Sequence, residues 1–282
     1  MMLRVTAEQK ASSRISKEEW REYTKTVWHI ANTSDPDHPA VFPIEIPTRL
    51  IKLFSFTGEK VLDPFAGTGT TAIAALNLNR KAVCVEQSAK YVGVIENRVS
   101  GATKKRRLEL IHGDARDLSK IADSSIGLAV TSPPYWNKAD YGRGKGNIGK
   151  IASYPGFLRE LKPAFSEVFR VLAPGRKFAV VTANVNQHTD HGLLTFPLSA
   201  DMLVMLREIG FVVVNEIIWS KDGTGGKWGS SNSQRPIFGS YPYPPNFLFK
   251  NVHEYVIVVA KPSAVATKGK TVLPYKKLME TD

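Results

Sequence analysis

The stretch that decides the fold runs from residue 61 to residue 71 and reads Val-Leu-Asp-Pro-Phe-Ala-Gly-Thr-Gly-Thr-Thr. Its first residues, together with Lys60 before them, form a short run typical of a buried strand. Its last threonines begin a helical segment. Gly67 and Gly69 allow a tight turn and a close approach of the backbone to a ligand. The stretch therefore predicts a strand, a glycine loop and a helix in succession.

Two phosphate-binding loops do not fit these residues. A P-loop needs a lysine directly after its last glycine, and the dinucleotide fingerprint needs a third glycine. Neither is present after Gly69, which also disfavours a nicotinamide-dependent oxidoreductase. For Gly67-Thr68-Gly69 taken alone, a plain tight turn is the alternative.

Short apolar runs alternate with helical segments along most of the chain. The runs expected to be strands are 60–63, 82–86, 108–111, 126–131, 177–182, 211–219 and 255–260. The segments expected to be helices are 46–54, 70–79, 89–100, 157–172 and 198–209, with a softer signal at 17–26. Pro163 is expected to mark either the start of the fourth of these helices or a kink in it. Because parallel strands need helical crossovers, this alternation predicts an α/β fold with a doubly wound, mostly parallel sheet.

A second informative stretch, residues 131–136, reads Thr-Ser-Pro-Pro-Tyr-Trp and follows the apolar run 126–130. Proline has no backbone N–H, so the carbonyl groups of this loop are expected to stay available at the rim of the sheet. Carbonyl oxygens suit a substrate that presents an amino group. For this stretch alone, a rigid surface loop with an aromatic lid is the alternative.

Together the two stretches resemble the S-adenosylmethionine-dependent amino-methyltransferases of DNA, which act on cytosine N4 or adenine N6. The likeness rests on residues 63–71 and 132–135, and it extends to segments 28–55, 216–221 and 253–261. It implies a Rossmann-like methyltransferase sheet of seven strands. The cofactor half precedes the catalytic half here, so the chain resembles a circular permutation of the family's commonest arrangement.

The resemblance also implies a role for individual residues. Asp63 and the backbone of Gly67–Gly69 would hold the methionine end of the cofactor, where a carboxylate suits an ammonium group. Glu86 would bind the ribose hydroxyls, and Asp114 would reach the adenine amino group, although Glu86 alone could be a solvated strand end and Asp114 a turn residue. The full cofactor-binding set is Asp63, Pro64, Phe65, Ala66, Gly67, Thr68, Gly69, Thr70, Thr71, Glu86 and Asp114. The catalytic set is Ser132, Pro133, Pro134 and Tyr135.

The chemistry of the second loop follows from what a base amino group needs. Its lone pair is delocalised into the ring, and the Ser132 hydroxyl and Pro133 carbonyl could accept its two hydrogens and localise that lone pair. Direct displacement then needs positioning and electrostatics. A paired base must first be flipped out, with Tyr135 as the expected stacking platform and Trp136 as either a second platform or a cap on the core. Cys84 lies inside a predicted strand, which disfavours a covalent cysteine mechanism.

The composition of the chain indicates which kinds of partner and metal site to expect. The net charge is +12, which favours a polyanion, with a generic basic surface as the alternative. One cysteine excludes a disulfide within the chain and a cysteine-based zinc site, and His188 and His191 are interpreted as loop histidines, so no metal is expected. No apolar run approaches the roughly 20 residues of a membrane span, and residues 1–17 carry no secretory signal. We therefore expect a cytoplasmic protein.

The organisation predicted is an N-terminal extension at 1–40, a catalytic domain at 41–262 and a basic tail at 263–282. Segments 131–150 and 222–250 are the candidates for reading DNA, unless they are solvated loops that merely cover the site.

Double-stranded DNA is the expected partner, and a homodimer and a cognate restriction endonuclease are left open. Serine at 132 favours cytosine N4 as the target. The alternatives are adenine N6, an RNA or guanine amino-methyltransferase, and a non-enzymatic nucleic-acid binder.

Overall fold

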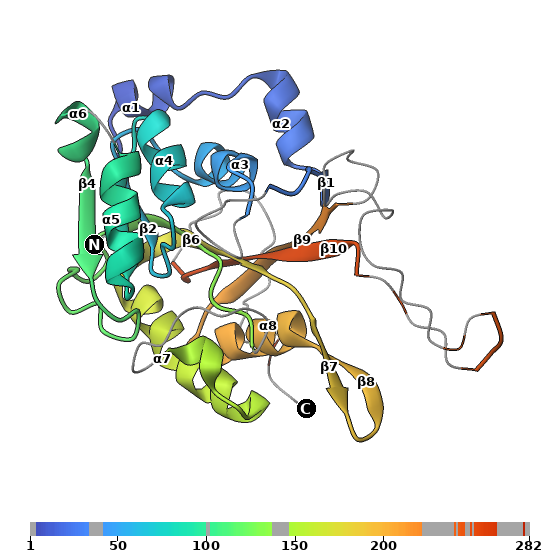
Figure 1. Ribbon diagram of the computed structural model, residues 1–282. Coiled ribbons are helices and arrows are strands. Elements are labelled where there is room, and N and C mark those ends of the chain that lie inside the picture. Colours follow the sequence, from blue (N-terminus) through green and yellow to red (C-terminus); the bar gives the residue numbers. More distant parts are fainter. Residues whose placement is uncertain are drawn as a thin grey trace.

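Figure 1 shows a computed structural model of the protein, in which one large sheet carries helices on both faces. The structure describes residues 4–33, 42–99, 102–136, 147–221 and 251–263, and also 240, 242–245, 249 and 279. Residues 137–146 and most of 222–250, which were expected to read DNA, lie outside the described residues, as does nearly all of the tail after 263. In the described part of the chain, no helix is both long and apolar enough to cross a membrane.

The strands build a mostly parallel sheet. They are β1 (Val27–His29), β2 (Lys60–Asp63), β3 (Lys81–Glu86), β4 (Leu108–His112), β5 (Ile126–Thr131), β6 (Leu172–Thr182), β7 (Val185–Thr189), β8 (Gly192–Phe196), β9 (Val212–Ser220) and β10 (His253–Ala260). Within the described residues, eight of them pair in the order β1-β9-β10-β6-β5-β2-β3-β4, and β7 and β8 form a separate hairpin. In the large sheet only β10 runs antiparallel to its neighbours. The doubly wound, mostly parallel sheet is thereby confirmed.

The large sheet has eight strands in the described residues and not the seven expected, because β1 adds to its edge. β1 pairs in parallel with β9 and sets Trp28 opposite Trp219. Trp28 is fully buried, and the Trp219 indole donates to the carbonyl oxygen of Ile30 at 2.8 Å. A single buried residue between two exposed ones is too short a pattern to predict a strand. Part of the segment assigned to an N-terminal extension thus belongs to the sheet.

Helices cover both faces of the sheet, and α3 and α4 lie opposite α7 and α8 (Figure 1). The helices are α1 (Ala7–Ser12), α2 (Lys17–Tyr23), α3 (Glu45–Phe54), α4 (Thr70–Asn77), α5 (Ala89–Arg98), α6 (Ala102–Lys105), the 3-10 turn η1 (Ile148–Lys150), α7 (Tyr154–Val171) and α8 (Leu198–Ile209). Successive strand residues face opposite ways: Val61 packs under α3 and α4, and Leu62 packs in the core with α7 and α8. Burial on both faces explains the continuous apolar strands.

Helix α7 begins three residues earlier than the helix expected at 157–172. The Ser153 hydroxyl caps it by accepting from the backbone of Gly156 at 3.2 Å, and a proline occupies its first turn. Pro163 lies inside the helix and does not mark its start. The strand β6 follows directly at Leu172, which was expected to end the helix.

The order of strands fixes where a ligand binds. From β2 the sheet continues to β3 and β4 on one side and to β5 and β6 on the other. The crossover connections run in opposite directions from this switch point. The crevice between them lies at the carboxyl ends of β2 and β5. Both sequence stretches of interest begin at these two strand ends.

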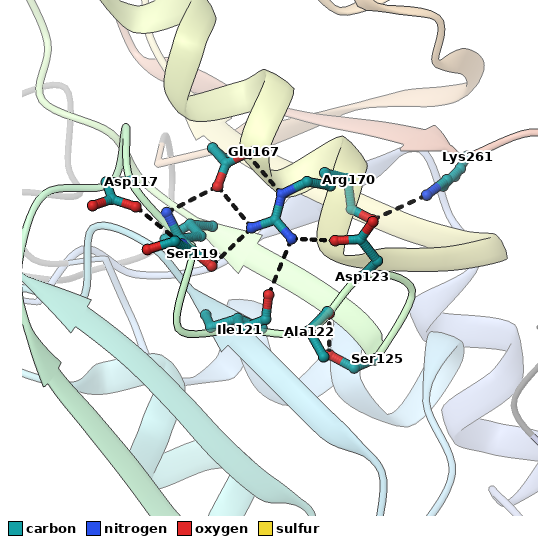
Figure 2. Close-up of polar contacts among 10 residues, drawn as sticks. Asp117, Ser119, Ile121, Ala122, Asp123, Ser125, Glu167, Arg170 and Lys261 are labelled. Atoms are coloured by element: carbon teal, nitrogen blue, oxygen red, sulfur yellow. Dashed lines mark hydrogen bonds and ion pairs between the residues drawn. The ribbon is translucent and has the colours of Figure 1, made fainter.

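Arg170, near the end of α7, fixes the loop that leads into β5 (Figure 2). Its guanidinium donates to the carbonyl oxygens of Leu118 at 2.8 Å and Ile121 at 3.1 Å. It also pairs with the carboxylates of Glu167 and Asp123, and these bonds raise the pKa of Arg170 further. One side chain therefore holds four groups where α7 meets the loop before β5.

We expect Arg170→Ala to lower the free energy of unfolding by about 2–4 kcal/mol, because two loop carbonyls lose the guanidinium as donor and the carboxylates of Glu167 and Asp123 lose their cation. The control is Lys162→Ala, which breaks an exposed ion pair with Glu208 on the neighbouring helix and is expected to change stability by less than about 1 kcal/mol. Urea unfolding of the two variants checks this. Equal effects would show that the loop does not depend on Arg170.

Candidate active site

Asp63 lies at the centre of the site, at the end of β2. It is 2% exposed, and its Oδ1 accepts from the Phe65 backbone at 3.1 Å and from the Thr131 hydroxyl at 2.6 Å. The second bond crosses from β2 to the end of β5, so it joins the glycine loop to the proline loop. Burial raises the pKa of Asp63 to about 6, although the hydrogen bonds oppose that rise. Among the described residues, no lysine or arginine forms an ion pair with Asp63.

The glycine loop follows Asp63 and takes the shape that its sequence predicts. Gly67 and Gly69 have φ of +52° and +84°, which favours glycine. A Cβ at Gly69 would also lie 3.0 Å from the Ile95 side chain of α5. The backbone of Ala66 donates to the carbonyl oxygen of Val85 at 3.0 Å, which ties the loop to β3. Residues 63–71 thus form the end of β2, the glycine loop and the first turn of α4.

Glu86, at the end of β3, holds this loop in place. Its Oε2 accepts from the Gly67 backbone and its Oε1 from the Ser88 backbone, each at 2.8 Å. Burial raises the pKa of Glu86, and these two amides moderate the rise. Each carboxylate oxygen can accept a second hydrogen bond, so the predicted contact with ribose hydroxyls stays compatible with this geometry.

Asp114 follows β4 and is engaged by its own neighbourhood. Both of its oxygens accept from the Arg116 guanidinium, at 2.6–3.2 Å, and Arg116 also binds Glu160 at 2.6 Å. Burial would raise the pKa of Asp114, but the bonds from Arg116 outweigh it and hold the pKa below its usual range. A contact with adenine would have to share these acceptor oxygens, so that assignment stays a prediction.

The proline loop leaves β5 with two aromatic residues turned inward. The Tyr135 hydroxyl donates to Oε2 of Glu254 at 2.8 Å, and the Ser132 hydroxyl lies 3.4 Å from the Tyr135 oxygen. Tyr135 is 6% exposed, so a base could stack on its ring only if neighbouring atoms moved. Its role as a stacking platform stays a prediction.

Trp136 is buried and packs edge-on against the rings of Tyr154 and Phe196. Its indole donates to the carbonyl oxygen of Ile151 at 2.9 Å. Of the two roles considered for it, this arrangement matches a cap on the core. Phe196 ends the β7–β8 hairpin, so the proline loop and the hairpin are packed against each other.

Three residues of this site were not singled out in the sequence as functional. Thr131 was taken as the end of a strand, and Glu254 and Lys221 only as part of terminal strands. Lys221 Nζ lies 2.5 Å from Oε1 of Glu254. The available signal was a charged residue directly beside a buried apolar strand, since such a charge is expensive unless it is paired.

Comparison with known proteins places the chain in a family. The profile of the DNA methylase family N6_N4_Mtase matches residues 2–97 and 126–280. The chain therefore belongs to this family of DNA methylases. Type II methyltransferase M.BglI from Bacillus subtilis is 43% identical over 82 residues, which cover 28% of this chain and 24% of that protein. The chain spans about a quarter to a third of the length of the curated relatives it matches first.

Two solved structures are similar. A protein from Clostridium thermocellum, assigned as an rRNA methylase, has a TM-score of 0.50 at 16% identity and covers 79% of this chain and 100% of its own. It shows the same methyltransferase fold. A protein from Thermus thermophilus, assigned as a DNA modification methylase and solved with S-adenosyl-L-methionine, is 32% identical, with a TM-score of 0.40 over 59% of this chain and 62% of its own.

The raised pKa of Asp63 gives a pH dependence of stability with a definite sign. The folded chain binds this proton more tightly than the unfolded chain, so the contribution is fully present below about pH 4 and is lost as pH rises through 6. Asp63→Asn removes this titration. We expect the free energy of unfolding of wild type, minus that of Asp63→Asn, to fall by up to about 3 kcal/mol between pH 4 and pH 6.5. Above pH 6.5 this difference should stay constant. Urea titrations across that range measure it, and a flat difference would contradict the assignment.

Proposed function

We propose that this chain is an S-adenosylmethionine-dependent DNA methyltransferase that transfers a methyl group to the N4 amino group of cytosine. The observation that carries the proposal is the bond between Thr131 and Asp63. It joins the loop that suits the cofactor to the loop that suits an amino group, at the switch point of the sheet. Membership of the DNA methylase family supports DNA as the substrate.

The residues at the end of β2 fit the cofactor. Asp63 is a buried carboxylate without a described cationic partner, and the bonds from the Phe65 backbone and the Thr131 hydroxyl both end on Oδ1. A ligand ammonium group at Oδ2 would supply the missing positive charge. Glu86, beside the same loop, has lone pairs for two hydroxyl groups. When bound, S-adenosylmethionine supplies a methyl group activated by a positively charged sulfur.

The proline loop performs the remaining chemistry by positioning. The Ser132 oxygen and the Pro133 carbonyl would accept the two hydrogens of the amino group and localise its lone pair toward the methyl group. Bound S-adenosylmethionine would supply the methyl group by direct displacement and leave as its neutral thioether, and the proton that the methylated nitrogen gives up would pass to solvent. The buried site lowers the effective dielectric constant and strengthens these interactions.

Cytosine N4 is favoured over adenine N6 by the residue at 132. Adenine enzymes of the family that this chain resembles more often carry aspartate or asparagine there. Serine offers a neutral oxygen, whereas an aspartate would add charge. Both bases present an amino group beside a ring nitrogen, so the pocket outside this loop must also contribute. Adenine N6 is therefore the alternative that the same loop would serve.

The β7–β8 hairpin is the described element best placed to contact DNA. It leaves the sheet at the carboxyl end of β6, beside the proline loop, and projects from the body of the molecule (Figure 1). Its exposed side chains include His188, His191 and Thr195, with Asn186 and Gln187 half-buried. A two-stranded ribbon fits the major groove, and these side chains can bind base edges or phosphates.

The affinity for the cofactor should depend on pH through Asp63. The ammonium group prefers the ionised carboxylate, so binding must release a proton below pH 6. We expect the wild-type affinity for S-adenosylmethionine to fall by close to tenfold per pH unit well below pH 6. Asp63→Asn should bind weakly at pH 7.5 and lose this pH dependence. Calorimetry at pH 7.5 and 5 tests it, and wild-type affinity in the variant would contradict the role of Asp63.

The target base is tested by weighing nucleosides. DNA lacking base modification is incubated with the protein and cofactor carrying a labelled methyl group, then digested for mass spectrometry. We expect the label on N4-methyldeoxycytidine, and Ser132→Ala should slow its appearance by about 10–1000-fold. Label found only on deoxyadenosine would replace cytosine with adenine and keep the amino-methyltransferase assignment. Label on neither base would contradict the proposed function.

A further inference from the structure

The end of β9 and the start of β10 hold a buried ion pair beside the proline loop. Lys221 and Glu254 are 13% and 11% exposed, and their charged atoms are 2.5 Å apart. The Lys221 ammonium also lies 4.4 Å from the centroid of the Trp219 ring. The backbone N–H of Lys221 donates to the carbonyl oxygen of Val252. Burying two charges costs much of what their attraction returns, so such a pair is weak evidence for a role in stability. A role in the site is the better explanation of its position.

The second oxygen of Glu254 continues the contact into the reactive loop. Oε1 binds Lys221, and Oε2 accepts the hydroxyl hydrogen of Tyr135 at 2.8 Å. The Ser132 hydroxyl donates toward the Tyr135 oxygen at 3.4 Å. A chain of polar contacts therefore runs from the end of β9, through β10, to the residue proposed to accept from the amino group.

The loop needs such an anchor because of its own sequence. Pro133 and Pro134 have no backbone N–H, so two consecutive residues cannot be tied down by donating from the main chain. Side chains must take over that function. The Trp136 indole bonds to Ile151 on one side, and the Tyr135 hydroxyl bonds to Glu254 on the other.

We propose that the Lys221–Glu254 pair is a positioning device, which acts through the Tyr135 hydroxyl to orient Ser132. This inference rests on the proposed function. The Glu254 carboxylate accepts a hydrogen bond from the Tyr135 hydroxyl. The Tyr135 oxygen therefore presents a lone pair to the hydrogen of the Ser132 hydroxyl. The lone pairs of the Ser132 oxygen are then directed away from Tyr135, toward the position of the amino group. Glu254 itself does not touch the substrate.

The inference separates two roles of Tyr135. A stacking platform needs only the ring, whereas this device needs only the hydroxyl. Tyr135→Phe keeps the ring and removes the hydroxyl. Glu254→Gln keeps the size of the side chain and removes its charge. The matched control is Glu59→Gln, which breaks another buried pair, with Arg176, before the amino end of β2 and far from this loop.

Single-turnover methyl transfer to unmodified genomic DNA, at saturating cofactor, measures the effect. We expect Tyr135→Phe and Glu254→Gln each to slow transfer by about 10–100-fold. The double variant should be no slower than the slower single variant, because both break one chain. Cofactor affinity by calorimetry should stay within about twofold in both. Glu59→Gln should lower the melting temperature and leave the transfer rate unchanged. Wild-type rates in the single variants, or fully additive losses, would overturn the inference.

Hydrogen exchange of the cofactor-free chain gives a readout that does not depend on methylation. The backbone amides of Tyr135 and Trp136 should exchange faster in Glu254→Gln and Tyr135→Phe than in wild type, and those in Glu59→Gln should not. Unchanged exchange at these two amides would overturn the positioning role. If exchange changes as expected but wild type labels no DNA base, the proposed function fails and the loop anchor stands.

Discussion

The bond from the Thr131 hydroxyl to the Asp63 carboxylate is the interaction on which the site depends. β2 and β5 are paired by their backbones as far as Leu62 and Ala129, and this bond joins the two strand ends beyond that pairing, where the crossovers diverge. The bond is buried, so it is strong, and its loss would leave a carboxylate without its shortest described donor. Because Asp63 begins the glycine loop and Thr131 begins the proline loop, this contact of 2.6 Å links the starts of the two loops directly.

Two further carboxylates serve the two loops in the same manner. Glu86 reaches from β3 and uses both oxygens on backbone amides around the glycine loop. Glu254 reaches from β10 and uses one oxygen on Tyr135 of the proline loop and the other on Lys221. The difference follows from the loops themselves: glycine loops offer N–H groups, and a double proline does not. One loop can be held by its main chain and the other needs a side chain.

The part of this architecture that the sequence predicts is the part with strong local patterns. The strands β2 and β5 match the expected bounds, and α8 does so as well, because continuous apolar runs define the strands and clear periodicity defines the helix. β1 and the β7–β8 hairpin are missed because β1 is only three residues long and the two hairpin strands, of five residues each, show no clear alternation of buried apolar and exposed polar residues. The Arg170 cluster and the pairing of Glu254 with Tyr135 could not be predicted. Their partners lie 119 residues apart in the second case, and only the fold brings them together.

The electrostatics of the site also explain why its buried charges lower the stability of the folded chain. Asp63 and Glu86 both have raised pKa values, mainly because burial disfavours their charged forms. In the described residues, neither carboxylate is neutralised by an ion pair, whereas Asp114, Glu167 and Glu254 each have an arginine or a lysine. The two unneutralised carboxylates are those that flank the glycine loop. A cation bound there would lower both pKa values and return the stability that burial of the charges removes. Among the described residues, this unmet negative charge lies at the carboxyl ends of the strands, where ligands bind in sheets of this kind.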